Sequence, residues 1–91
     1  MIHEILSHGA QNALSASEVS KITNLTPREI RHVVEHQRLA GHIILSDNRG
    51  YYLPHDDVSI AKREISSWIA NRIATAKTIL KTIEKAQSVT H

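Results

Sequence analysis

The chain of 91 residues fits one small domain, and a chain of this length buries only a modest core. It contains no cysteine, which excludes disulfide bonds and thiolate metal sites. Its net charge is only +2, although residues 58–91 contain six basic side chains against two acidic ones. A balance this mild is compatible with nucleic-acid binding without requiring it.

Neither a membrane span nor a secretory signal is visible in the sequence. No segment approaches the roughly 20 apolar residues that a membrane-spanning helix needs. The first residues, Met1-Ile2-His3-Glu4, lack a basic region followed by a long apolar stretch. We therefore expect a cytoplasmic protein that does not associate with a membrane.

Apolar residues at helical spacing begin the chain. Ile2, Ile5 and Leu6 share one side and predict a helix over residues 2–10. Gly9 is a weak position within it, because glycine in a helix interior costs up to about 1 kcal/mol. We expect this first helix to be modest.

Two capping boxes follow. In Ser15-Ala16-Ser17-Glu18 and in Thr26-Pro27-Arg28-Glu29, a hydroxyl and a carboxylate three residues apart can satisfy each other's free backbone N–H groups. Proline at the first helical position strengthens the second box, since its missing N–H costs nothing there. The boxes predict helices over residues 16–23 and 27–40, with Leu25 buried in the turn between them.

A short hairpin is expected next. Residues 43–46 and 50–53 are rich in strand-forming types and flank the turn-forming Asp47-Asn48-Arg49-Gly50. Pro54 ends the second strand.

Residues 58–87 contain neither Gly nor Pro and predict one long helix. Its apolar residues form a heptad seam that Arg72 interrupts. We expect the first half of the helix to join the core and the second half to pair with a second copy in a homodimer. The alternatives are that the seam folds back on the first helix or that it binds a different protein. The residues expected in the core are Ile60, Ile65, Trp68 and Ile69, and those expected at the dimer interface are Ala76, Ile79, Leu80 and Ile83.

The elements together predict an α+β fold, mainly α with a small β-hairpin, in which residues 1–57 form the domain and residues 58–87 the long C-terminal helix. Residues 15–54 resemble the winged helix-turn-helix of biotin-repressor-like bacterial regulators and of small prophage DNA-binding proteins. The capped helices, Leu25 in the turn, and Arg49-Gly50-Tyr51-Tyr52-Leu53-Pro54 carry the resemblance. It implies a double-stranded DNA partner and a role in transcription control or in a DNA transaction of a phage or mobile element, without enzymatic activity or a cofactor.

The resemblance makes the third helix the recognition helix, whose N-terminal half enters the major groove. It also implies phosphate contacts at the helix starts and a minor-groove or backbone contact at the hairpin tip. A monomer has few cations on this surface and could neutralise only a few DNA phosphates, so its binding would be weak. We therefore expect the protein to bind DNA as a dimer, which doubles the number of these cations. The implied contact residues are Arg28, Arg31, His32 and Glu35 on the third helix, Ser15, Ser17 and Thr26 at the helix starts, and Asn48 and Arg49 at the tip.

Two other readings compete with DNA binding. The string His32-Val33-Val34-Glu35-His36 matches the H-x-x-E-H pattern of inverted zinc peptidases. Such an enzyme needs a further ligand and a substrate cleft, for which this chain has little room, so we expect no metal site and no catalysis. Glu29 and Glu35 dilute the basic surface of the third helix. They favour an alternative in which the winged helix is only a scaffold and the long helix binds a partner protein.

Overall fold

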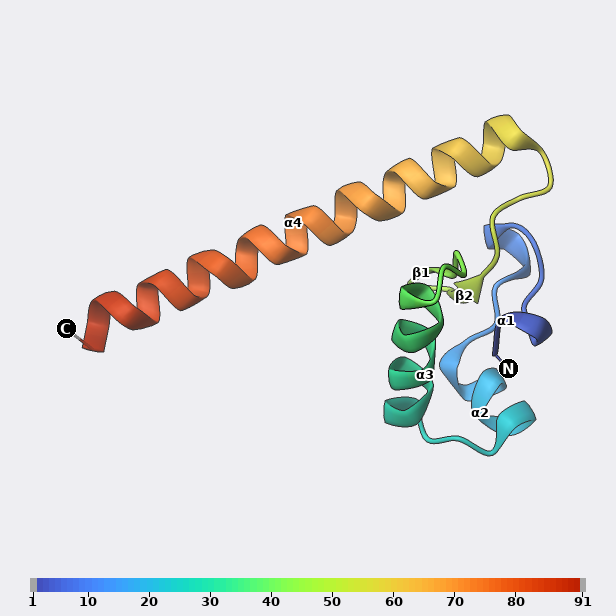
Figure 1. Ribbon diagram of the computed structural model, residues 1–91, viewed down its shortest axis with the longest axis horizontal. Helices are drawn as coiled ribbons and strands as arrows, with labels where there is room; N and C mark the ends of the chain where they lie inside the picture. The colour runs from blue at the N-terminus through green and yellow to red at the C-terminus, as the bar shows by residue number, and fades with distance from the viewer. Residues whose placement is uncertain (1, 91) are drawn as a thin grey trace.

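The computed structural model describes residues 2–90, and the side chains of residues 2–85. Three helices precede a hairpin, and a long helix follows it (Figure 1). The predicted fold class, mainly α with a small β-hairpin and a long C-terminal helix, is confirmed. The elements are α1 (Ile2–Ile5), η1 (Ala10–Asn12, a 3-10 turn), α2 (Ala16–Thr23), α3 (Pro27–Leu39), β1 (Leu45–Asp47), β2 (Gly50–Tyr52) and α4 (Val58–Thr90).

Both capping boxes form as the sequence predicts. At the start of α2, the Ser15 hydroxyl accepts a hydrogen bond from the Glu18 N–H, and the Glu18 carboxylate accepts one from the Ser15 N–H, each at 3.1 Å. Thr26 and Glu29 repeat this exchange at the start of α3. Asn24 ends α2 in the left-handed conformation, with φ of 60°, which produces the sharp turn into α3.

The expectation of one helix over residues 2–10 is wrong. Helix α1 ends at Ile5, because the next residues pair with the far end of the hairpin instead of continuing the helix. The Leu53 N–H donates to the Ser7 carbonyl and the Gly9 N–H donates to the Leu53 carbonyl, both at 2.9 Å. Gly9 has φ of 91°, a conformation that glycine adopts readily. At this residue the chain turns away from Leu53 and enters the 3-10 turn.

The hairpin is shorter than predicted but has an extra neighbour. Strands β1 and β2 pair antiparallel, with Leu45 opposite Tyr52. The predicted strand start at residue 43 is too early, because the Ile44 carbonyl accepts from the Arg38 guanidinium. Leu14 exchanges two backbone hydrogen bonds with Tyr51, at 2.9 and 2.8 Å, and so adds a third strand-like segment.

Gly50 permits this third segment to approach. A Cβ atom at Gly50 would lie 2.0 Å from the Leu14 carbonyl oxygen, and the residue has φ of 132°. Any larger side chain would therefore separate the hairpin from the segment that leads into α2.

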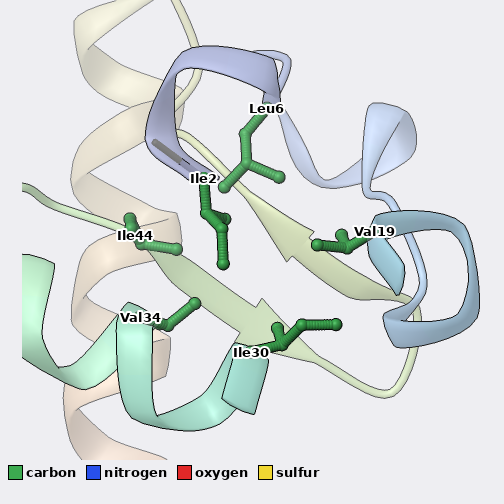
Figure 2. Packing of buried hydrophobic residues seen from close by; sticks show 6 residues of the cluster. All are labelled: Ile2, Leu6, Val19, Ile30, Val34 and Ile44. Atoms are coloured by element: carbon green, nitrogen blue, oxygen red, sulfur yellow. The ribbon is translucent and has the colours of Figure 1, made fainter. Parts of the chain in front are cut away.

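The core lies between the first three helices and the hairpin. Side chains from α1, α2 and α3 converge there with the residue that precedes β1 (Figure 2). Leu25 packs against this cluster half-buried, whereas Ile22 near the end of α2 is 57% exposed. The cluster consists of Ile2, Leu6, Val19, Ile30, Val34 and Ile44.

The expectation that the first half of α4 joins the core is not met. Ile69 is 46% exposed, and the other expected residues, Ile60, Ile65 and Trp68, are half-buried outside the core cluster. The reason is that α4 packs beside β1 and then extends past the rest of the molecule (Figure 1). Among residues 2–90, no helix has both the length and the apolar character to cross a membrane.

Candidate nucleic-acid interface

The exposed side of α3 presents Arg28, Arg31 and His32. Ile30 and Val34 face the core from the same helix, so the 100° step between residues directs these three side chains outward. Within the described part of the chain, none of the three side chains has a hydrogen bond or an ion pair with another residue. Their donors are therefore available to a ligand.

Glu35, the fourth residue expected to contact DNA from α3, is already bound within the protein. Its carboxylate accepts a hydrogen bond from the Arg38 guanidinium at 2.6 Å and one from the Arg72 guanidinium at 3.3 Å. A carboxylate shared by two guanidinium groups is a poor acceptor for a base amine and repels a phosphate less than a free one would. The structure thus gives Glu35 a role in holding α4 to α3.

Trp68 completes this contact. The guanidinium groups of Arg38 and Arg72 lie over its ring, 4.7 and 4.8 Å from the centroid. Arg38 also donates from Nε to the Ile44 carbonyl at 2.8 Å. Burial lowers the pKa of the Arg38 guanidinium from its ordinary value, and the hydrogen bond to Glu35 opposes that shift.

Glu64 fixes the beginning of α4 in a similar way. Its two carboxylate oxygens accept backbone hydrogen bonds from His55, at 2.8 Å, and from Ala10, at 3.0 Å. Glu64, Trp68 and Arg72 recur every fourth residue, so they form one row along α4, which we call the docking row. The four-residue spacing is visible in the sequence. Most residues that the docking row contacts lie too far away along the chain to be predicted from it.

The hairpin tip carries a neutralised cation. Arg49 donates from its guanidinium to the Asp47 carboxylate at 2.7 Å, and its backbone N–H donates to the same carboxylate at 2.8 Å. The hydrogen bond to Asp47 raises the pKa of Arg49, and the same bond lowers the pKa of Asp47. Arg49 must break this exposed ion pair before it can reach a phosphate, whereas Asn48 beside it is exposed.

Seven of the nine residues expected to contact DNA line three hollows on the surface. Ser15 lines a shallow hollow with Asn48 and Arg49, which joins the start of α2 to the hairpin tip. Arg28 and His32 line a second hollow, on the side of α3 next to Leu25. Arg31 lines a third, together with Glu35, Arg38 and Arg72. The remaining two, Ser17 and Thr26, are exposed at the starts of α2 and α3.

The zinc-peptidase reading gains no support from the geometry. Within residues 2–90, no group of three or more His, Asp or Glu side chains is arranged to hold a metal ion. Glu35, the base in that reading, is held by two guanidinium groups.

No family model, curated protein or solved structure matches this chain. A function must therefore be inferred from the surface of α2, α3 and the hairpin, and from α4.

The second half of α4 offers a different kind of surface. Toward its C-terminus the helix extends away from the rest of the molecule (Figure 1), and its apolar side chains there are exposed. Ile79, Leu80 and Ile83 are 54, 58 and 47% exposed, and Ala76 is exposed on the same side. These four are the residues that the sequence predicts at a dimer interface.

Proposed function

We propose that this protein binds double-stranded DNA, with α3 inserted in the major groove and the hairpin beside it as a wing. The supporting observation is that Arg28, Arg31 and His32 are exposed on one helix without partners among the described residues, next to a capped helix-turn-helix. Guanidinium groups are the commonest readers of guanine edges and also bind phosphates. The proposed setting is transcription control or a DNA transaction of a phage or mobile element.

Electrostatics favour an interface of limited strength. Residues 1–57 contain five basic and seven acidic side chains, and Glu35, Arg38 and Arg49 are engaged within the protein. Arg28 and Arg31 are therefore the main cations of the reading surface. Each copy of the domain would therefore neutralise few DNA phosphates, and its affinity for DNA should fall only moderately as the salt concentration rises.

The hollow between α2 and the hairpin tip supplies the complementary backbone contacts in this proposal. Asn48, which lines this hollow, and Ser17, which follows the hollow's Ala16 in α2, carry neutral donors that suit phosphate oxygens beside the groove. Such contacts orient the domain on the duplex without reading the sequence.

The test is to select bound sequences from a random duplex pool and then to measure variants on the recovered duplex. Arg28→Ala or Arg31→Ala should weaken binding by about 1–3 kcal/mol where the arginine reads a base. Lys81→Ala is the matched control, because it removes the same charge from an exposed position on α4 far from α3. Equal affinity of all three variants and the wild type, with folding intact, would contradict the assignment of α3.

A second candidate function is a protein-interaction module that binds its partner through α4. The exposed apolar side chains beyond Arg72 favour it. This alternative predicts that no duplex is enriched from the pool and that duplex DNA is not bound even at low salt.

A further inference from the structure

The exposed apolar side chains of α4 are arranged symmetrically about Ala76. Ile73 and Ile79 lie three residues to either side of it, and Ile69 and Ile83 lie seven residues to either side. The four isoleucines are 46–54% exposed. Together with Leu80 and Ala76 they form a surface that only Arg72 interrupts, which we call the apolar face of α4.

The apolar face does not coincide with the side of α4 that packs against the domain. At 100° per residue, Trp68 and Glu64 of the docking row point about 80° and 120° away from Ala76 at the centre of the apolar face, whereas Arg72 lies within the edge of that face. The domain is therefore attached beside this face and does not cover it, which agrees with the exposure of Ile69 and Ile73. Another helix can lie along it from Ile69 to Ile83, a length of about 21 Å.

We propose that the occupant of the apolar face is the α4 of a second copy of this chain, antiparallel to the first, with a two-fold axis at Ala76. In this arrangement Ile69 meets Ile83 of the second copy, and Ile73 meets its Ile79. A contact about a two-fold axis must be self-complementary, and the symmetric placement of the four isoleucines meets this condition because it brings apolar side chains against apolar side chains.

The other features of α4 agree with a second copy. Ala76, the smallest side chain of the face, lies at the axis, where it permits close approach of the two helices. Lys81 and Lys85 lie on the opposite side of α4, so like charges do not meet at the contact. Antiparallel helices also oppose their dipoles.

The pairing has a consequence for DNA, which rests on the proposed function. The two-fold axis of an antiparallel helix pair is perpendicular to the plane of the two helices. Because the docking row points away from that plane, both domains lie on the same side of the pair, one toward each end. Two copies of α3 related in this way would read a two-fold symmetric DNA site.

The pairing is tested without DNA, so its failure is distinguishable from failure of the proposed function. In sedimentation equilibrium, the wild type should form a dimer, and Ile73→Glu should weaken the dimer at least about tenfold because it places a charge in an apolar contact. Ala74→Glu is the matched control, since it adds the same charge at the adjacent residue but on the side of α4 away from the apolar face. A wild type that stays monomeric up to about 1 mM would overturn the proposal.

Disulfide cross-linking tests the direction of the pair, and the chain has no native cysteine to interfere. Ala76→Cys should cross-link with itself across the axis. A mixture of Ile69→Cys and Ile83→Cys should give a mixed disulfide, while Ile69→Cys alone should stay largely uncross-linked. Self-cross-linking of Ile69→Cys would indicate a parallel pair and overturn the antiparallel arrangement, as would a mixture that forms no mixed disulfide.

Discussion

The domain formed by residues 2–57 and helix α4 are held in different ways. In the domain, Ile30, Val34 and their neighbours are almost completely buried, and both helix starts are closed by capping boxes. Helix α4 instead attaches through carboxylate and guanidinium groups of the docking row and leaves its apolar side chains exposed from Ile69 onward. The domain thus has a core of its own, and the exposed apolar side chains of α4 agree with the proposed pairing of two copies.

The largest expected effect comes from the core. Ile30→Ala should lower the free energy of unfolding by about 2–5 kcal/mol, because it leaves a cavity among fully buried side chains. Ile79→Ala, on the apolar face of α4, should change it by less than about 0.5 kcal/mol when measured at a concentration where the protein is monomeric. Urea unfolding followed by circular dichroism provides both values, and equal losses would contradict the contrast between the two regions.

A smaller loss is expected at the hairpin. Gly50→Ala should destabilise the protein more than Gly41→Ala, although both glycines have positive φ. A Cβ at Gly41 meets no atom within 4 Å, so that variant bears only backbone strain of about 1–3 kcal/mol. The Cβ at Gly50 also collides with the Leu14 carbonyl. Thermal unfolding of the two variants gives the comparison, and a lower melting temperature for Gly41→Ala would argue against close packing of the Leu14 segment.

Loss of a docking-row side chain should loosen the attachment of α4 more than it destabilises the domain. Trp68→Ala removes the ring that both Arg38 and Arg72 contact, and cation–π contacts of this kind contribute about 0.5–2 kcal/mol each. Hydrogen exchange should become faster in residues 58–72, with little change in α2 and α3. Ser66→Ala, at an exposed position on the same helix, is the control and should leave exchange unaltered. Uniformly faster exchange throughout the domain would show that α4 is part of its core.

The smallest expected effect is the contribution of the two capping boxes to the pH dependence of stability. Backbone hydrogen bonds from Ser15 and Thr26 lower the pKa values of Glu18 and Glu29 below 4.5. Because the folded pKa is below the unfolded one, this stabilisation is present above about pH 4.5 and is lost as the pH falls through the folded pKa values. The double variant Glu18→Gln and Glu29→Gln should show a weaker loss of stability between pH 5 and pH 3 in unfolding experiments. An unchanged pH profile would remove the capping carboxylates as its cause.

The sequence was most informative where contacts are local. Ser15 and Thr26 predict their helices because each cap closes within three residues. The ion pair of Arg49 with Asp47 is equally local, because the two residues lie in the same turn, and it opposes a contact of Arg49 with DNA.

Contacts between distant parts of the chain could not be predicted in this way. Helix α1 stops early because Ser7 and Gly9 pair with Leu53. Glu35 is occupied because Arg72, 37 residues later, reaches it from α4. Helical spacing placed Glu35 on the correct exposed side of α3 but carried no information about which element lies beside it.

The salt dependence of affinity for duplex DNA is the most direct test of the central proposal, that α3 reads DNA. Fluorescence anisotropy of a labelled duplex should show binding whose affinity falls as salt increases. The slope should be smaller for the double variant Arg28→Ala and Arg31→Ala, because removing an arginine that binds a phosphate reduces the slope by about 1. No binding at low salt, or a double variant that leaves both the affinity and the slope unchanged, would contradict the account.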